Sequence, residues 1–169
     1  ILDACRKTGF PVVLKGIGET ILHKTESGLV RVGMGSEAQV LDAVKEMKAS
    51  AKEKLGAFLV QPVISGKREF VAGMFKDPQF GPVIVFGLGG IYTEVLKDIA
   101  FKLAPVTEAD MEDMFDQLSS KKLLNAFRGE SAVNKETIKT ILRGLSDMAR
   151  IFPDIREIDI NPLIIQKDG

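Results

Sequence analysis

The only histidine of the chain, His23, belongs to the one side-chain type that readily exchanges a proton or a phosphoryl group near neutral pH. It stands beside Lys24 in LKGIGETILHKTESGL, residues 14–29, where glycine, serine, threonine and charged residues indicate a loop. Two interpretations are open. His23 is either a solvated surface histidine or a nucleophile on a loop that serves a neighbouring site.

Lys15 ends the apolar run PVVLK and is followed by Gly16 and Gly18. A cation beside backbone that carries no side chain suits a phosphate site, because the chain can approach the anion closely. A lysine that ends a strand in solvent gives the same pattern. Lys15 is therefore a candidate phosphate ligand, and a solvated strand end is the alternative.

A glycine-rich sequence, FGLGGIYTEV, follows a second apolar run and contains Gly87, Gly89 and Gly90. Their amides could face a polyanion, although the spacing differs from that of Walker and Rossmann loops, and a plain glycine turn is the alternative.

The residues that follow these glycines include two acids. If residues 92–98 form a strand, Glu94 and Asp98 share one face about 13 Å apart, which is too far to hold one metal ion. Glu94, nearer the glycines, is then the better site candidate.

The sequence EIDINPL, residues 157–163, has strand alternation. It places Asp159 and Asn161 on one face, with Cα atoms about 6.6 Å apart. Two oxygen side chains at this spacing could share one magnesium ion. A half-buried strand with a polar outer face is the alternative. Lys15, the glycines and this pair would together supply the cation, amides and metal ligand of a nucleoside triphosphate site.

Composition argues against several classes of function. The 23 basic and 23 acidic residues cancel, so the basic surface of a nucleic-acid or membrane-surface binder is not expected. One cysteine excludes an intrachain disulfide and, with one histidine, a zinc or multi-histidine centre. No apolar run approaches the ~20 residues that span a bilayer, and no leader is recognised. We therefore expect a cytoplasmic protein without nucleic-acid or membrane partners.

The elements that would position these residues alternate in mixed blocks. Helices are expected at residues 2–8, 36–55, 107–118 and 134–151, with a short helix after Ser120. Strands are expected at 11–15, 29–34, 57–63, 68–75, 82–88, within 92–105, and at 156–166, and the turn DPQFG joins two of them as a hairpin. This order predicts an α+β fold with antiparallel pairs rather than a doubly wound sheet.

The chain resembles the nucleotide-binding domain of ADP-forming acyl-CoA synthetases, an ATP-grasp family related to succinyl-CoA synthetase β subunits. The resemblance runs from residue 9 to 165 and is carried by GFPVVLKG, ILHKTESGLVRVG, LVQPV, MFKDPQFGPVIVFGLGGIYTEVLKD, LAPVT, FRGE and EIDINPLII. It implies an ATP-grasp fold of two lobes with mixed, largely antiparallel sheets. Residues 1–63 would form part of the first lobe and the hinge, and residues 64–169 the second lobe.

The family domain normally begins with an earlier helix and strand. It continues past the INP strand to a further strand that carries a second magnesium ligand. The resemblance therefore implies that the domain is incomplete at both ends in this chain.

The resemblance also implies roles for particular residues, with ATP or ADP held between the lobes. Lys15 would contact the phosphates, and the main chain of Gln61, Pro62 and Val63 would lie near the adenine. Asn161 of the INP motif corresponds to a magnesium ligand, and Asp159 or Glu94 would partly replace the second ligand.

Three further residues fall in family motifs. Glu69 and Glu94 stand where the family keeps acids, and Arg128 of FRGE would orient phosphate.

For His23, in the HK motif, the resemblance implies a phosphoryl carrier. It would work between ADP and a histidine of a CoA-binding partner, which is either an α subunit or a fused domain. Such an acid–thiol ligase interconverts acyl-CoA, ADP and phosphate with the free acid, ATP and CoA.

Two alternatives are a non-catalytic, synthetase-like regulatory region of a protein lysine acetyltransferase and a bare interaction scaffold. The presence of Lys15, His23, Glu94 and Asn161 together favours the enzyme, because a sensor has less need of all four.

Overall fold

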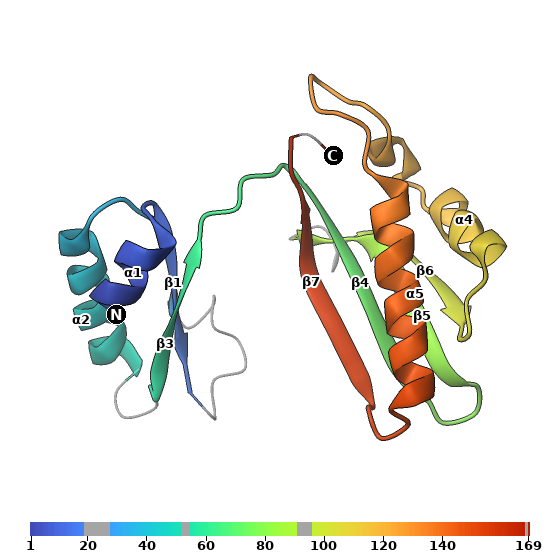
Figure 1. The fold of residues 1–169 in the computed structure, drawn as a ribbon, viewed down its shortest axis with the longest axis horizontal. Coiled ribbons are helices and arrows are strands. Elements are labelled where there is room, and N and C mark those ends of the chain that lie inside the picture. The colour runs from blue at the N-terminus through green and yellow to red at the C-terminus, as the bar shows by residue number, and fades with distance from the viewer. Residues whose placement is uncertain (19–27, 52–54, 91–95, 168) are drawn as a thin grey trace. The chain divides into compact units, whose positions relative to one another are not determined.

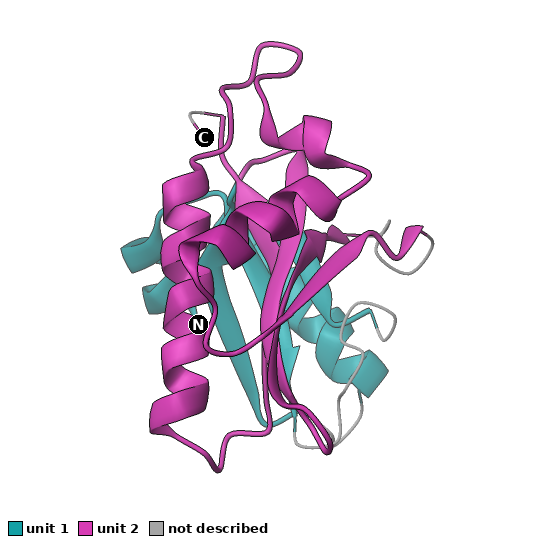
Figure 2. Cartoon of the chain, turned by 90° about the vertical axis from the view of Figure 1, so that its right-hand side faces the viewer, with its two compact units in different colours: residues 1–64 teal, residues 65–169 magenta. Residues whose placement is uncertain are grey.

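The chain divides into two compact units, residues 1–64 and residues 65–169 (Figure 2). The structure, a computed structural model, describes residues 1–18, 28–51, 55–90, 96–167 and 169. Within these residues, no helix is both long enough and apolar enough to cross a membrane.

As far as it is described, the first unit comprises a three-stranded antiparallel sheet and two helices (Figure 1). Its elements are α1 (Leu2–Thr8), β1 (Val12–Ile17), β2 (Val30–Met34), α2 (Glu37–Ala51) and β3 (Ala57–Pro62). The strand order is β2-β1-β3, so that β1 is central and pairs with both neighbours. The central strand therefore fixes the face on which each of its side chains lies.

Strand β1 alternates between a buried and a less buried face. Val12, Leu14 and Gly16 are buried, and Leu14 packs with Met47 of α2 in the core of this unit. Lys15, in the opposite phase, lies on the face that does not enter this core. The alternation thus turns Lys15 away from the helices.

The described part of the second unit comprises a four-stranded antiparallel sheet with helices on one face (Figure 1). Its elements are β4 (Arg68–Asp77), β5 (Gly81–Leu88), β6 (Ile99–Leu103), α4 (Glu108–Gln117), the 3₁₀ helix η3 (Lys121–Leu124), α5 (Lys135–Ile151) and β7 (Glu157–Ile165). The strand order is β6-β5-β4-β7. The α+β class, the antiparallel pairing and the β4–β5 hairpin are as the sequence predicts.

The core of this unit lies between the sheet and helices α4 and α5. Phe86 of β5 stacks on Phe70 of β4 at a centroid distance of 5.4 Å and meets the ring of Phe115 of α4 edge-on at 5.3 Å. Because these side chains face the helices, the alternate residues of β4, beginning with Glu69, lie on the opposite face of the sheet.

Two expectations about strands differ from the structure. Strand β1 does not end at Lys15 but continues to Ile17, because Gly16 pairs with Phe58 of β3 and its amide donates to the carbonyl of Leu29. In addition, Leu96, Lys97 and Asp98 do not belong to a strand, and strand β6 begins only at Ile99.

Candidate functional site

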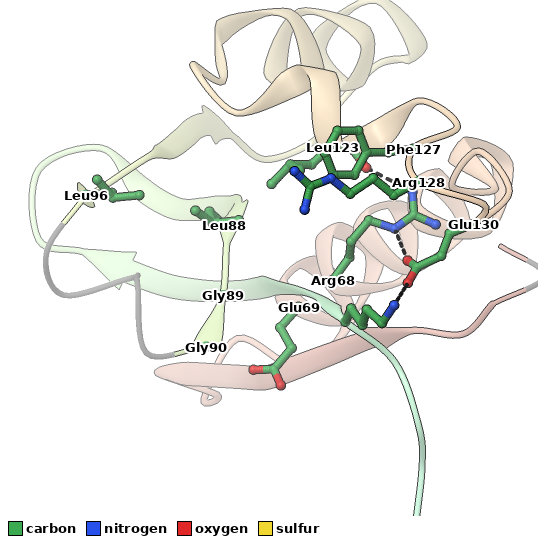
Figure 3. Close-up of a pocket in the computed structure, with 11 residues that line it drawn as sticks. Arg68, Glu69, Leu88, Gly89, Gly90, Leu96, Leu123, Phe127, Arg128 and Glu130 are labelled. Atoms are coloured by element: carbon green, nitrogen blue, oxygen red, sulfur yellow. Dashed lines mark hydrogen bonds and ion pairs between the residues drawn. The ribbon is translucent and has the colours of Figure 1, made fainter.

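A cavity of about 670 Å³ lies in the second unit at the open end of the β4–β5 hairpin, where β4 begins and β5 ends (Figure 3). It combines leucine and phenylalanine side chains with charged ones, and its lining residues are Lys67, Arg68, Glu69, Leu88, Gly89, Gly90, Leu96, Leu123, Phe127, Arg128 and Glu130. A mixed lining of this kind suits a ligand with an apolar part and an anionic part. The cavity brings together Glu69, Gly89, Gly90 and Arg128, which are predicted separately from the sequence.

Arg128 reaches the cavity on a tight turn made by the FRGE motif. Phe127 and Glu130 exchange two backbone hydrogen bonds, of 3.1 and 3.0 Å. The two residues between them have positive φ angles, 48° at Arg128 and 84° at Gly129, as in the two-residue turns of β-hairpins. Such a conformation is uncommon for a residue other than glycine, and functional sites are where it tends to be kept.

Two of the glycines of FGLGG, Gly87 and Gly89, have no room for a side chain. A Cβ atom at Gly87 would come within 2.5 Å of the carbonyl oxygen of Asp98, and one at Gly89 within 2.6 Å of the backbone of Phe70. The amide of Gly89 donates to the carbonyl of Glu69 at 2.8 Å. In this structure the Gly89 amide is therefore paired with β4 rather than turned toward the cavity.

Two acids, Glu94 and Asp98, follow these glycines in the sequence. Glu94 lies outside the described residues. Asp98 does not face the cavity, because its carboxylate accepts hydrogen bonds of 2.8 Å from the amides of Ser119 and Ser120. Burial raises the pKa of Asp98, but the hydrogen bonds from Ser120 and Ser119 outweigh burial and hold the pKa below its usual value. Asp98 thus serves to fix the turn after α4.

In the first unit, Lys15 and Gln61 lie on the same face of the sheet. Lys15 pairs with Leu59 of β3, and Gln61 stands two residues further along that strand, opposite Val13. Lys15 makes no hydrogen bond or ion pair with another described residue through its side chain. Its ammonium group is accordingly available to an anion from outside the chain.

The backbone beyond Gln61 continues the pairing of β3. Pro62 pairs with Val12, and the Val63 amide donates to the carbonyl of Pro11 at 3.4 Å. The expected adenine-binding residues therefore form the end of this strand.

Asp159 and Asn161 are both exposed on β7, while Ile158 and Ile160 between and beside them pack toward the core. The pairing with β4 shifts at this point. Phe70 pairs with Leu163 and Ala72 with Ile160, so two residues of β7, Asn161 and Pro162, oppose a single residue of β4. This bulge is not predicted from the sequence.

The ligand atoms that Asp159 and Asn161 offer can be compared with those that Mg²⁺ prefers. A carboxylate and an amide oxygen are hard ligands, and an exposed position leaves room for the several water molecules that Mg²⁺ keeps. Among the described residues, no group of three or more His, Cys, Asp and Glu side chains could hold a metal ion by itself. Asp159 and Asn161 thus fit part of a hydrated magnesium site.

His23 and its neighbour Lys24 lie outside the described residues. Sequence reasoning missed Arg68, which is 5% exposed at the edge of the cavity. A signal for its burial exists in the sequence, because Arg68 stands in phase with the apolar residues Phe70 and Ala72 of the same strand.

A family model described as an ATP-grasp domain matches residues 1–169. The ADP-forming 4-hydroxybutyrate–CoA ligase of Nitrosopumilus maritimus is 37% identical over 99% of this chain and 25% of its own length. The β subunit of the ADP-forming acetate–CoA ligase I of Pyrococcus furiosus is 34% identical over 95% of this chain and 72% of the subunit. The chain therefore spans a quarter of one relative and most of the other.

Solved structures that are similar to this chain include an acetyl-coenzyme A synthetase. Acetyl-coenzyme A synthetase 1 of Candidatus Korarchaeum cryptofilum, in complex with coenzyme A and Ca-AMPCP, matches with a TM-score of 0.92 at 36% identity, over 99% of this chain and 76% of that one. A second structure of that protein contains coenzyme A and Mg-AMPPCP and is described as having its phosphohistidine segment pointing towards the nucleotide-binding site. It matches with a TM-score of 0.87 at 36% identity, over 99% of this chain and 76% of that one.

Proposed function

This chain belongs to the ATP-grasp family, and from that premise we propose that it is the nucleotide-binding part of an ADP-forming acyl-CoA synthetase. The whole enzyme would interconvert acyl-CoA, ADP and phosphate with a free acid, ATP and CoA. The observation that carries the proposal is the match over 99% of the chain to a synthetase solved with coenzyme A and Ca-AMPCP. The two curated relatives are ligases and give no support to an acetyltransferase regulatory domain.

In this proposal charged side chains contact the phosphates of the nucleotide. Lys15 would contact the phosphates, since its ammonium group has no partner among the described residues. The backbone of residues 61–63 would face the adenine. Arg128, presented at the cavity by a tight turn, would hold a phosphate oxygen through its planar fork of donors.

The remaining acids complete the proposed site. The carboxylate of Glu69 lies next to Gly90 at the cavity. It would accept hydrogen bonds from the sugar or from polar groups of the site. Asp159 and Asn161 would hold Mg²⁺, which when bound neutralises charge on the phosphates. Glu94 stays a candidate from its family position.

His23 is proposed as the phosphoryl carrier. A ring nitrogen of His23 would form a P–N bond as the P–N bond to the histidine of the CoA-binding partner breaks. The terminal phosphate oxygen of ADP would then take the phosphoryl group as the bond to His23 breaks, which yields ATP and a free imidazole. The partner, a separate α subunit or a fused domain, would supply the CoA and acyl sites.

The test uses the full-length protein with its partner. On incubation with Mg²⁺ and ATP labelled in the γ-phosphate, we expect acid-labile, base-stable phosphate on the peptide that contains His23. His23→Ala should abolish this label and acyl-CoA formation, while the control Lys48→Ala, on the exposed face of α2, should keep both. Full acyl-CoA synthesis by His23→Ala would refute the relay.

A further inference from the structure

Arg68 is a buried arginine whose side-chain contacts all go to one segment of the chain. Its guanidinium donates to the carbonyls of Leu123 at 3.0 Å, Asn125 at 3.1 Å and Ser131 at 2.6 Å, and its Nε donates to a carboxylate oxygen of Glu130 at 3.1 Å. The side chain is 4% exposed and that of Glu130 is 13% exposed. Every one of these partners lies between residues 123 and 131, on both sides of the FRGE turn.

These contacts reach the turn from a rigid element. Arg68 is the first residue of β4, where it pairs with Ile165 of β7, and Phe70 two residues further on is fully buried in the core. The two legs of the turn are also joined to each other by the two backbone bonds between Phe127 and Glu130 and by the bond from the Val133 amide to the Leu124 carbonyl at 2.9 Å. Just after β7, the carbonyl of Lys167 accepts a bond of 3.1 Å from the Ser131 amide. The Arg68 side chain therefore supplies four bonds that run from the sheet to the two legs of the turn.

The turn carries Arg128 into the cavity. In Figure 3 the side chains of Arg68 and Glu130 meet beside the turn, the Arg128 side chain extends from the turn away from that pair, and Glu69 points away from all three. The guanidinium of Arg128 lies over the ring of Phe127 at 5.2 Å, so the residue before it also limits its direction. A shift of the turn would move this guanidinium with it.

We propose that Arg68 is a positioning residue that fixes the FRGE turn and thereby the Arg128 guanidinium at the nucleotide. This inference rests on the proposed function, in which Arg128 contacts a phosphate. Arg68 itself contacts no substrate. It acts by joining the first residue of β4 to both legs of the turn.

The chemistry of the four acceptors explains why arginine is needed. Three carbonyls and one carboxylate surround a planar cation with five donors in a fixed arrangement, and a lysine offers only three donors from a single nitrogen. Lysine would keep the positive charge opposite Glu130 but would lose some of the hydrogen bonds to the three carbonyls. Arg68→Lys is therefore a change that loosens the turn without leaving Glu130 unpaired.

A double-mutant cycle on the full-length protein tests the inference, with the affinity for MgATP measured by titration calorimetry. We expect Arg128→Ala to weaken binding about tenfold, because a charged hydrogen bond is lost. Arg68→Lys should weaken binding about fivefold, and the double variant no more than Arg128→Ala alone. If Arg68→Lys acted through general stability instead, the fold-changes of the two single variants would multiply in the double variant. That result would overturn the inference.

A matched control repeats the chemical change elsewhere. Arg143→Lys alters an exposed arginine of α5 that bonds Glu108 at 3.0 Å, and it should leave MgATP affinity unchanged. Hydrogen exchange of amides 123–131 should quicken in Arg68→Lys and not in the control. Unchanged exchange there would also overturn the inference.

If Arg68→Lys fails to fold, Glu130→Gln takes its place in the cycle, because it keeps an acceptor and removes only the charge. Glu130→Gln should weaken MgATP binding about twofold to threefold, which is less than the effect of Arg68→Lys. This effect should again be seen only when Arg128 is present. Weak binding by Arg128→Ala together with normal binding by Arg68→Lys would refute the positioning role alone. Normal binding by Arg128→Ala would refute both that role and the proposed contact of Arg128 with phosphate.

Discussion

The carboxylate of Glu69 lies directly against the backbone of Gly90, so that a Cβ atom at Gly90 would come within 2.5 Å of Glu69 Oε2. Gly90 also has a φ of 69°, a conformation that residues with side chains rarely adopt. The neighbouring Gly89 meets different atoms, since its Cβ would lie 2.6 Å from the backbone of Phe70 in β4. The two glycines therefore respond differently to the same substitution.

We predict that Gly89→Ala destabilises the protein more than Gly90→Ala. The carboxylate of Glu69 can move aside from a methyl group, whereas the backbone of Phe70 is fixed in the sheet and its side chain in the core. We expect losses of about 3 kcal/mol for Gly89→Ala and about 1–2 kcal/mol for Gly90→Ala. Urea unfolding measures both, and equal losses would contradict the difference in packing.

A second prediction concerns the exposed pair on β7. Asn161→Ala and Asp159→Ala should each raise, by about tenfold or more, the Mg²⁺ concentration that half-saturates ATP binding in the full-length protein. Glu157→Ala is the matched control, because Glu157 is an exposed acid of the same strand and phase, paired with Phe75 near its far end. A shift of equal size in this control would indicate general electrostatics rather than coordination.

The sequence predicted that pair but not the bulge that presents it. Ile158 and Ile160 follow one alternation, whereas Leu163 and Ile165, which also face the core, follow the other. An extra residue is needed between them, and the structure places it at Asn161 and Pro162. The change of phase is visible in the sequence, but only the partner strand shows that it is a bulge rather than the end of the strand.

Other differences have similarly local causes. The hairpin at DPQFG was predictable because turn residues and two β-rich runs adjoin. The extension of β1 through Gly16 was not, because glycine composition indicates a loop. Here a Cβ atom at Gly16 would lie 2.6 Å from Cδ2 at the end of the Leu55 side chain, a contact between segments far apart in the sequence. A strand of nearly apolar residues can thus be predicted from the sequence, whereas a close contact between distant segments cannot.

The cavity shows the same limit. FRGE is recognisable as a motif, but its buried partner Arg68 stands about sixty residues away in the sequence, so their contact depends on the packing of the sheet against the η3 segment. Asp98 was expected on a strand face with Glu94. Its two bonds to the amides of Ser119 and Ser120 arise from a turn that strand alternation does not describe.

A third prediction follows from those two bonds. Asp98→Ala would leave both amides without their acceptor and should cost about 1–3 kcal/mol of unfolding free energy, while Asp98→Asn, which keeps one acceptor, should cost less. The pKa of Asp98 lies below its usual value in the folded protein. Its contribution is therefore present above the usual pKa of about 3.9 and is lost as the pH falls below it. Urea unfolding at pH 7 and pH 3 should show the gap between wild type and Asp98→Ala narrowing, and a constant gap would contradict this account.

The last prediction concerns Lys139 of α5, whose side chain is 6% exposed and is surrounded by carboxylates. It bonds Glu112 at 2.6 Å and Glu136 at 3.0 Å, and it also bonds Glu108 of α4. Hydrogen bonds from Lys139 hold the pKa values of Glu108 and Glu112 below their usual range, and the same bonds raise the pKa of Lys139. This cluster joins the two helices that cover the sheet.

The sign of the pH effect follows from the direction of these shifts. Carboxyls with a lowered pKa stabilise the fold above the usual glutamate pKa of about 4.3, and this contribution disappears as the pH falls through their folded values. The raised pKa of Lys139 contributes stability that is fully present below the usual lysine pKa of about 10.4 and is lost only at strongly alkaline pH, as the pH rises through the folded value.

Lys139→Met tests the cluster, since it keeps most of the apolar stem and removes the cation that the three glutamates share, while Glu108 keeps its contact with Arg143 at 3.0 Å. At pH 7 the variant should be clearly less stable than wild type, and the difference should shrink toward pH 3 as the glutamates become neutral and no longer repel one another. Lys121→Met is the control, because its ion pair with Asp116 is exposed at 3.7 Å and should contribute little at any pH. Parallel stability curves for wild type and Lys139→Met would show that the carboxylates do not depend on this lysine.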